Sequence, residues 1–410
     1  MIKILNHQDA LPLLSRKAQR FEQAERVVAP ILAAVRARGD AAVIEYNLKF
    51  GGAASLAGCL DSAPPLAPDF QEAVSAAAAN IREYAKLQLP QEHYLDCGDG
   101  RRLGQIVRPL DSMGAYTPAG RYPLPSTLLM NVIPAQVAGV KTICAACPNP
   151  SPEILGLAKW LGVTHFFRMG GAQAIAALAY GTESVPRVDR IVGPGNIYVA
   201  AAKKLIAGET GIDFIAGPTE IVILAAEGNP KWLAADMLAQ AEHDVDASAI
   251  LLTTSRELAR RVAEELERQL AVLPTAAVAR PALDHNGAIV IVDSMAQAVE
   301  FSNTLAPEHL ALHDPSLLPS ISNAGSVFLG PMSPEAAGDY ASGPNHVLPT
   351  SGAARLRGGL SSADFVKVIS VQELSPQALA KLAPAITTLA RAEGLEAHAR
   401  SVEVRREARP

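Results

Sequence analysis

Cysteine is scarce in this sequence, which excludes a small secreted domain held together by disulfides. Only four cysteines occur among 410 residues, whereas disulfide-dependent domains are dense in them. Cys144 and Cys147 form a C-x-x-C pair in KTICAACPNP, but no second pair exists to complete a four-thiolate zinc site. We interpret both as small buried residues, and a redox or metal role is the alternative.

Long apolar runs and basic stretches are also missing. No apolar run reaches the roughly 18 residues of a membrane span, and the N-terminal MIKILNHQDALPLL lacks the charged-then-apolar layout of a signal peptide. The net charge is −5, without the basic stripe of a nucleic-acid-binding surface. We therefore expect a cytoplasmic protein with neither a membrane nor a nucleic acid as its partner.

Apolar strands alternate with helical segments over much of the chain. The short apolar runs KTICAAC, THFFRMG and DRIVGPG are separated by longer helical patterns between residues 116 and 219. The same alternation resumes after residue 219 with EIVILAA, SAILLTT and GAIVIVD. Such alternation predicts parallel sheets covered by helices, and 410 residues suit two or three domains.

Outside these two regions the pattern is helical or loop-like. Residues 16–48 predict helices that break at Arg38-Gly39-Asp40, a longer helix begins at Pro68, and residues 104–116 predict short strands. A helical segment near the C-terminus is a candidate docking arm.

Two polar clusters interrupt apolar surroundings in the second region. Gln240 and His243 have i, i+3 spacing at a predicted helix end, so they share one face and can reach one metal ion. Glu308 and His309 follow a proline and precede an apolar strand. A carboxylate beside an imidazole in a cleft suits acid–base chemistry. The alternatives are a solvated helix end and a turn that faces water.

Two further clusters lie nearer the C-terminus. In GDYASGPNHV, Asp339 could offer an oxygen to a metal and His346 a nearby imidazole, or the segment is a structured loop with an aspartate cap. Glu393 and His398 alone indicate an exposed helix. No cysteine belongs to any cluster, and nitrogen with oxygen donors suits zinc or a similar divalent ion.

The usual dinucleotide fingerprint G-x-G-x-x-G follows none of the predicted strands. Two glycine turns remain, at Gly170-Gly171 and at Gly193-Pro194-Gly195, and each opens a predicted helix at the carboxyl end of a strand. Free N–H groups and the helix dipole make such positions suitable for an anionic ligand.

Long runs of this sequence closely resemble the histidinol dehydrogenase family. The runs that carry the resemblance are GAYTPAGRYPLPSTLLMNVIPAQVAGV, MGGAQAIAALAYGT, IVGPGNIYVAAAK, AGPTEIVILA, AQAEHD, APEHL, AGSVFLG, GDYASGPNHVLPT, LSSADFVK and EGLEAH. The resemblance implies an α/β fold with two incomplete Rossmann-like parallel-sheet domains related to aldehyde dehydrogenases. It also implies a homodimer in which an N-terminal segment and a C-terminal arm cross over.

We expect four parts along the chain. An N-terminal segment covers residues 1–20, and the first α/β domain, with the metal and catalytic residues, combines residues 21–115 and 220–363. The second, NAD-binding α/β domain covers residues 116–219. The C-terminal arm over residues 364–410 reaches the partner subunit.

The resemblance also implies a role for each candidate residue. The zinc ligands would be Gln240, His243 and Asp339, with His398 from the partner subunit as the fourth. The acid–base pair would be Glu308 and His309, and NAD would contact Tyr116, Gln173 and Asn196. The substrate would contact Thr219, Gln240, His243, His309, Asp339, His346, Glu393 and His398.

The implied activity is the zinc-dependent oxidation of L-histidinol to L-histidine through L-histidinal, with two NAD and one zinc ion per subunit. This is the last step of histidine biosynthesis. Two departures from the family pattern are visible: Thr219 stands where many relatives have serine, and Pro118-Ala119-Gly120 replaces the more usual Pro-Gly-Gly.

Several other functions remain open. The same scaffold could oxidise another small polar alcohol, such as a sulfonated diol, or could bind a metal or nucleotide without catalysis. A hydrolase with zinc-activated water would work without NAD. A cysteine nucleophile for the aldehyde step is disfavoured, because none of the cysteines lies in a matched run that carries chemistry.

Overall fold

The computed structural model describes residues 2–14, 21–58, 60–118, 123–215 and 217–407. The chain divides into two compact units, and each is described separately. The first unit comprises Met1–Gln88 and Asp111–Phe365, and the second comprises Leu89–Leu110 and Val366–Pro410. In the described part of the chain, every helix is too short or too polar to cross a membrane.

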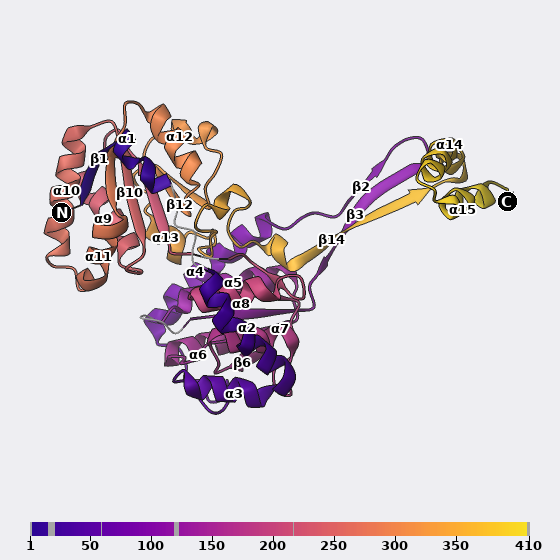
Figure 1. Ribbon diagram of the computed structural model, residues 1–410, viewed down its shortest axis with the longest axis horizontal. Coiled ribbons are helices and arrows are strands. Elements are labelled where there is room, and N and C mark those ends of the chain that lie inside the picture. Colours follow the sequence, from indigo (N-terminus) through magenta and orange to yellow (C-terminus); the bar gives the residue numbers. More distant parts are fainter. Residues whose placement is uncertain (1, 15–20, 59, 119–122, 216, 408–410) are drawn as a thin grey trace. The chain divides into compact units, whose positions relative to one another are not determined.

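A six-stranded sheet in the first unit has the order β1-β11-β10-β9-β12-β13, and all neighbouring strands are parallel (Figure 1). Its strands are β1 (Lys3–Asn6), β9 (Glu220–Leu224), β10 (Ser248–Thr253), β11 (Ala288–Ile291), β12 (His309–Leu312) and β13 (Ser326–Leu329). The central strands β9, β10 and β12 are almost entirely buried. A parallel sheet covered on both faces requires such continuous apolar runs.

Helices cover both faces of this sheet. One apolar core joins the sheet to α9 (Pro230–Ala241), α10 (Arg256–Leu270) and α11 (Ala276–Asn286). The opposite core joins it to α12 (Met295–Leu305) and to the N-terminal α1 (His7–Ala10). The short helix α13 (Glu335–Tyr340) follows β13 and contacts α9. Strand β1 is an addition that sequence analysis left in a separate N-terminal segment.

A second, five-stranded parallel sheet in the first unit has the order β6-β5-β4-β7-β8. Its strands are β4 (Ser112–Tyr116), β5 (Thr142–Ala146), β6 (His165–Phe167), β7 (Arg190–Val192) and β8 (Gly211–Ile212). In chain order this arrangement is 3-2-1-4-5, which is the Rossmann order without its last strand. Strands β9 to β13 repeat the same order, so the fold prediction of two incomplete Rossmann-like sheets is confirmed.

The helices of this part are α2 (Phe21–Arg38), α3 (Asp40–Lys49), α4 (Pro68–Leu87), α5 (Pro125–Ala138), α6 (Pro152–Trp160), α7 (Gly171–Tyr180) and α8 (Ile197–Ile206). Helix α5 packs against α4, α6 and β4. Short 3-10 helices lie at Leu11–Leu14, Pro315–Ser320, Ala353–Arg355 and Ser362–Phe365. The predicted helix break at Gly39 is confirmed, because this residue has a φ of 55° between α2 and α3.

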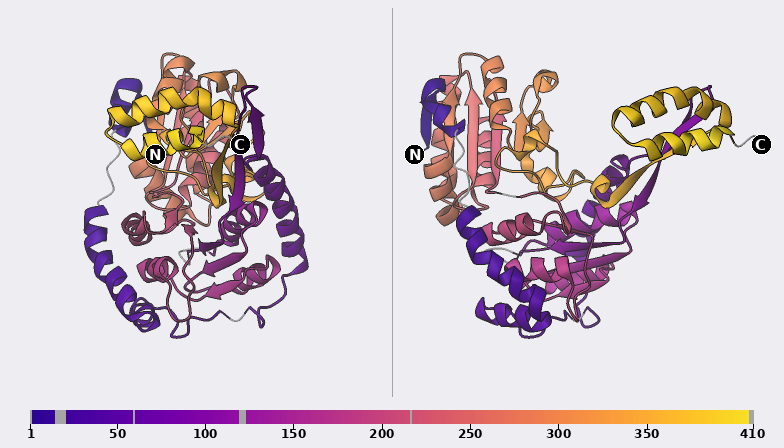
Figure 2. Two further views of the ribbon diagram at one scale, coloured as in Figure 1. Left: turned by 90° about the vertical axis from the view of Figure 1, so that its right-hand side faces the viewer. Right: turned by 45° about the vertical axis from the view of Figure 1, so that its right-hand side comes forward.

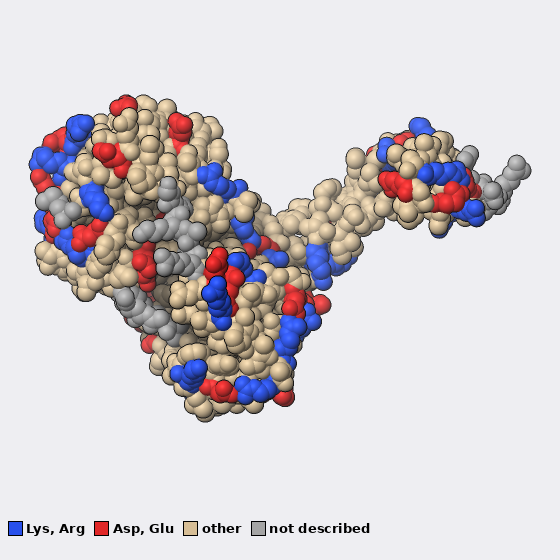
Figure 3. Space-filling model, viewed as in Figure 1, with Lys and Arg blue, Asp and Glu red and all other residues tan. Residues whose placement is uncertain are grey.

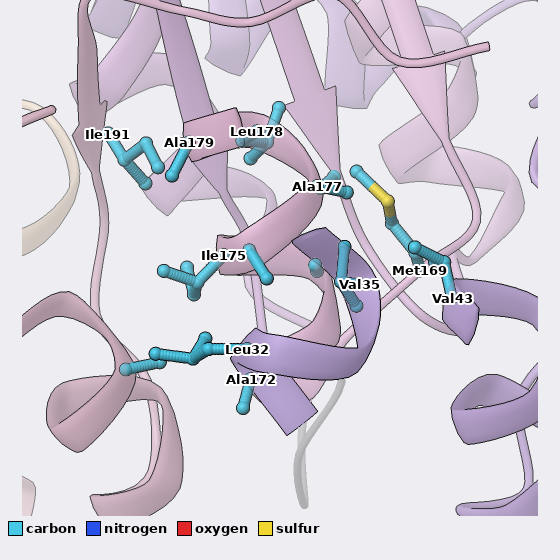
Figure 4. Packing of buried hydrophobic residues seen from close by; sticks show 14 of the residues in the cluster. Leu32, Val35, Val43, Met169, Ala172, Ile175, Ala177, Leu178, Ala179 and Ile191 are labelled. Atoms are coloured by element: carbon cyan, nitrogen blue, oxygen red, sulfur yellow. The ribbon is translucent and has the colours of Figure 1, made fainter. Parts of the chain in front are cut away.

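Helices α2 and α3 pack on the five-stranded sheet. Figure 4 shows Leu32 and Val35 of α2 and Val43 of α3 beside Met169 and Ile175 of the segment around α7. From the sequence we expect residues 21–115 to form one domain with residues 220–363, whereas α2 and α3 contact the elements of the five-stranded sheet. Each of these helices has one apolar face, and an apolar face alone does not indicate which of the two sheets the helix packs against. The exact domain boundaries stay a prediction.

The second unit is a three-stranded antiparallel sheet with a helix pair (Figure 2). Strand β3 (Arg101–Pro109) pairs with β2 (His93–Asp96) on one side and with β14 (Val366–Leu374) on the other. Helices α14 (Pro376–Ala392) and α15 (Glu396–Glu407) pack against each other. The second unit therefore combines most of the predicted arm over residues 364–410 with β2 and β3, which the sequence-based prediction assigned to the first α/β domain.

Charged side chains are intermixed over the surface that Figure 3 shows. On this face Lys and Arg alternate with Asp and Glu rather than forming one extended stripe. Several ion pairs of the described residues have both side chains exposed, such as Arg36–Glu209 and Arg260–Glu264. Exposed pairs of this kind contribute only up to about 1 kcal/mol each, so they do not determine the fold.

Candidate active site

Polar residues converge at the amino-terminal edge of the six-stranded sheet. Glu220 begins β9 and His309 begins β12, and these strands are direct neighbours with His309 opposite Ile221. Because β9 and β10 are parallel, helix α9 between them must run back towards the amino ends of the strands. Its C-terminal end therefore brings Gln240 to this edge, and His243 follows in the next turn.

The Glu308 carboxyl is buried and held by two donors. The Thr219 hydroxyl donates to Glu308 Oε2 at 2.5 Å, and the Glu220 backbone N–H donates to the same oxygen at 2.9 Å. Burial raises the pKa of Glu308 well above its ordinary value, although both hydrogen bonds lower it. A carboxylate at this position is a stronger base than one in water.

The His309 imidazole is buried and has one unpaired nitrogen. Its Nδ1 lies 3.2 Å from the Glu220 carbonyl oxygen, so Nδ1 carries the hydrogen and donates to it. Its Nε2 then has a free lone pair and has no hydrogen-bond partner among the described residues. Burial lowers the pKa of His309 to about 4. At neutral pH this imidazole is uncharged and able to accept a proton at Nε2.

We expect the His309 ring to titrate well below pH 6.5, the ordinary value for histidine, because burial favours its neutral form. The measurement is NMR of protein with 13C-labelled histidine and no added metal, and the His309 signal is assigned by its absence in His309→Gln. A titration midpoint at or above pH 6.5 would contradict the uncharged state at neutral pH.

Donor atoms suitable for a divalent ion lie beside His309. His243 Nε2 is 3.7 Å from Asp339 Oδ2, and ligand atoms of His243, Glu335 and Asp339 all lie within 4.8 Å of one another. The Gln240 carboxamide lies 2.8 Å from the Thr219 hydroxyl and 2.7 Å from the Glu335 carboxyl. Gln240, His243 and Asp339, which were predicted to share one metal ion, thus lie in one cluster.

Glu335 is the residue of this cluster that sequence analysis missed. It lies one helical turn before Asp339 on α13, and its side chain is buried with Oε1 3.4 Å from His309 Nδ1. Burial raises the pKa of Glu335 well above its ordinary value, and the nearby carboxylates Asp339 and Glu308 raise it further. The i, i+4 spacing from Asp339 is the only sequence signal that could have indicated it.

These residues fit a zinc ion by their chemistry. Imidazole nitrogen with carboxylate and carboxamide oxygen is a donor set that zinc accepts. The buried carboxyl groups of Glu308, Glu335 and Asp339 also repel one another. A bound cation would offset this unfavourable concentration of negative charge.

His346 forms part of the wall of the same site. Its Nδ1 lies 2.8 Å from the Asp339 carbonyl oxygen and its Nε2 lies 3.4 Å from the Thr127 hydroxyl. Nδ1–H therefore donates to Asp339, and Nε2 accepts from Thr127 of helix α5. Both ring nitrogens are thus engaged, which suits a substrate-lining residue better than a metal ligand. Thr127 was missed by sequence analysis, because α5 and His346 are far apart in the chain.

The cluster opens into a small cavity of about 180 Å³. Its polar walls come from Thr127, Thr219, His243, Glu308, His309, Asp339 and His346. Its apolar walls include Leu124, Pro194 and Phe214. A cavity of this size with several polar groups suits a small polar ligand.

A larger cavity of about 740 Å³ lies at the carboxyl ends of the five-stranded sheet. Tyr116, Gln173 and Asn196, the three residues assigned to NAD, all line it. Gln173 Nε2 donates to Asn47 Oδ1, and Gln173 Oε1 is buried without a hydrogen-bond partner in the described part of the chain. An unpaired acceptor in a wall of this cavity fits a ligand with hydroxyl or amide donors, such as a dinucleotide.

Three of the N–H groups at these two helix starts are already engaged. Gly171 N–H donates to the Tyr116 hydroxyl at 3.1 Å, and the Asn196 side chain caps α8 by accepting from Tyr198 and Val199. The prediction that free N–H groups of these turns attract an anion is therefore wrong for these donors. A local cap satisfies them more readily than a distant ligand does.

A buried ion pair fixes the second glycine turn. Lys203 Nζ lies 2.5 Å from Asp213 Oδ1 and donates to the Gly193 carbonyl at 2.6 Å, while Asp213 Oδ2 accepts from Gly193 N–H at 2.8 Å. Both charged side chains are almost fully buried. The hydrogen bonds that each makes to Gly193 hold the turn that carries Pro194 and Asn196.

The two cavities share part of their walls. Leu124 and Pro194 line both the small cavity and the large cavity. A ligand in the large cavity can therefore lie next to a ligand in the small one. This adjacency is what transfer of a hydride between a substrate and a dinucleotide requires.

Some predicted residues lie elsewhere or outside the described residues. Glu393 and His398 belong to the second unit, where both are exposed around the start of α15, so their role stays a prediction. Ala119 and Gly120 of the loop that departs from the family pattern lie outside the described residues. Burial raises the pKa of Cys144 to about 12 and that of Cys147 to about 11, which favours buried, unreactive thiols.

Comparisons with known proteins identify one family across the chain. The sequence profile of the histidinol dehydrogenase family matches residues 14–406. A histidinol dehydrogenase of Geobacillus kaustophilus is 49% identical over 407 residues, which cover 94% of this chain and 95% of that protein. A histidinol dehydrogenase from Geobacter metallireducens is 46% identical and covers 96% of this chain and 94% of its own length.

The fold comparison agrees with the sequence comparison. The crystal structure of histidinol dehydrogenase from Elizabethkingia anophelis superposes with a TM-score of 0.94 at 36% identity, covering 100% of this chain and 98% of that chain. An acetylating aldehyde dehydrogenase from Geobacillus thermoglucosidasius has a TM-score of 0.52 at 12% identity, covering 89% and 94% of the two chains. This second likeness concerns the fold alone and agrees with the expected aldehyde-dehydrogenase-like fold.

Proposed function

This chain belongs to the histidinol dehydrogenase family, and we propose that it oxidises L-histidinol to L-histidine through L-histidinal, with NAD and one zinc ion per subunit. The observation that carries the proposal is the unpaired Nε2 of buried His309. His309 lines a small polar cavity, and two of the residues that line this cavity, Leu124 and Pro194, also line the cavity of Tyr116, Gln173 and Asn196. This adjacency supports the proposal that His309 acts as the base beside a bound dinucleotide.

Oxidation of a primary alcohol to a carboxylate removes four electrons, which corresponds to two hydrides. NAD, when bound in the large cavity, supplies the hydride acceptor. Zinc, when held by Gln240, His243 and Asp339 with His398 of a second subunit, supplies a positive charge that orients the substrate's nitrogen atoms. Thr219 and His346 would contact the substrate from the walls of the small cavity, and Glu393 from the second subunit.

The residues of this chain perform the proton transfers. We propose that His309 Nε2 accepts the hydroxyl proton of histidinol, because it is neutral, buried and unpaired. Glu308 then takes a proton from the water that adds to the aldehyde, and the protonated His309 returns its proton to the aldehyde oxygen. His309 deprotonates the resulting hydrate for the second oxidation. The Glu220 carbonyl keeps the Nδ1 hydrogen in place throughout, and so holds Nε2 as the basic nitrogen.

The test is NADH formation from L-histidinol by the purified protein, with and without a chelator. We expect two NADH for each histidinol consumed, loss of activity after chelation, and its return with added zinc. Turnover without NAD would indicate a hydrolase instead. Faster oxidation of a sulfonated diol than of histidinol would assign the chain to the alternative substrate.

The remaining assignments follow from this activity. We propose that the protein acts at the last step of histidine biosynthesis in the cytoplasm, as a homodimer with shared active sites. We also propose that the C-terminal arm over residues 364–410 provides the crossover.

A further inference from the structure

Helix α5 contains a proline whose missing N–H leaves one backbone carbonyl without its helical donor. Pro134 lies inside α5, and the carbonyl four residues earlier is that of Met130. Met130 is fully buried. A buried carbonyl without a donor is costly, so this oxygen requires a partner from outside the helix.

Asn345 supplies that partner. Its Nδ2 donates to the Met130 carbonyl at 2.7 Å, and its Oδ1 accepts from the Val347 backbone N–H at 2.8 Å. The side chain is only 7% exposed. Its N–H group therefore binds the backbone of α5, and its oxygen binds the backbone of its own loop. Only a carboxamide of this length provides both the donor and the acceptor.

The residue next to Asn345 is His346, whose ring lies in the wall of the small cavity. His346 Nδ1 lies 2.8 Å from the Asp339 carbonyl oxygen, and its Nε2 lies 3.4 Å from Thr127. Thr127 lies three residues before Met130 on the same helix, so both contacts use one face of α5. The loop from Asp339 to His346 is thus fastened to α5 at two neighbouring points.

We propose that Asn345 is a positioning residue for the oxidation, and this inference rests on the proposed function. It fixes the segment that carries Asp339 and His346 against the buried Met130 carbonyl, which Pro134 leaves without a helical donor. The small cavity is formed between this loop and α5, so the hydrogen bond sets its width. Asn345 itself does not line the cavity and acts through its neighbours.

Two substitutions separate positioning from stability. Asn345→Asp keeps the shape of the side chain but removes the N–H donor, and it places an oxygen against the Met130 carbonyl. Pro134→Ala restores the helical N–H, which can satisfy the Met130 carbonyl from within α5. The double variant therefore repairs the buried carbonyl without restoring the attachment of the loop.

We expect Asn345→Asp to lower both Tm and kcat/KM for L-histidinol, the latter by about 10- to 100-fold, because small misplacements of a reacting group cost about that much. The affinity for NADH should stay unchanged, since Asn345 is absent from the walls of the large cavity. In the double variant Tm should return towards that of Pro134→Ala, while kcat/KM stays low. Pro134→Ala alone should keep activity within about twofold of wild type.

A second readout does not depend on activity. The His346 ring signal in 13C-histidine NMR, assigned by His346→Gln, should shift in the double variant relative to Pro134→Ala. Recovery of kcat/KM together with Tm, or an unchanged His346 signal, would overturn the positioning role. A wild-type protein that fails to oxidise histidinol would instead overturn the proposed function, and the NMR comparison would still decide the role of Asn345.

Discussion

His309→Asn is expected to lower kcat for L-histidinol by a factor of about 10² to 10⁴, the usual contribution of a general base, with zinc content close to that of wild type. Asparagine has a similar reach to Nδ1 and can still donate to the Glu220 carbonyl, so the local fold is preserved. It lacks a basic nitrogen where Nε2 stands. The measurements are steady-state NADH formation and metal content by elemental analysis.

His313, directly after the same strand, provides a matched control. It follows the last residue of β12, whereas His309 begins the strand, and it lines neither of the two cavities. His313→Asn should therefore leave kcat within about twofold of wild type. If His309→Asn lost its zinc, the imidazole would be a metal ligand rather than the base, and unchanged kcat would remove His309 from the chemistry.

The sheets could be predicted from the sequence because their strands are short, buried and apolar on both faces. Strands β5 and β9 are examples of such runs, and the helices between them carry the longer period. The pairing of β3 with β14 could not be predicted, because it joins residues more than 250 positions apart and neither strand alternates clearly. Strand β1 was missed because four exposed or half-buried residues give little signal.

The residues of the candidate site also fall into those that the sequence indicates and those that it does not. Glu308, His309, Gln240 and His243 are visible in the sequence because they interrupt apolar segments, and the family resemblance gave them roles. Glu335 and Asn345 gave no such signal. Their significance comes from distant partners, namely His309 for Glu335 and a carbonyl freed by Pro134 for Asn345.

The position of the site also differs from the general rule for such sheets. Ligands of open α/β sheets usually bind at the carboxyl ends of the strands, and the large cavity follows this rule. The small cavity uses the amino ends of β9 and β12 instead. Two sheets that contribute opposite edges can place a dinucleotide and a second ligand next to each other, as the shared Leu124 and Pro194 indicate.

Mixing two inactive variants is expected to restore activity if subunits share active sites. His243→Ala removes a proposed zinc ligand of the first unit, and His398→Ala removes the ligand proposed to come from the partner. Each variant alone should be nearly inactive. In a mixed dimer one site has both lesions and the other has none. Unfolding, mixing and refolding equal amounts should therefore yield about a quarter of wild-type activity, since half of the dimers are mixed.

The second unit supports this expectation through its surface. Large apolar side chains are exposed on it, including Val368, Leu389, Leu395 and Val404, and an exposed apolar surface of this kind is typical of a subunit interface. His398 is also exposed, so it is available to another subunit. The control is a mixture of His243→Ala with Gln240→Ala, which alter the same unit and should not complement. Absence of recovery in the first mixture, with mixed dimers shown by native mass spectrometry, would confine each site to one subunit.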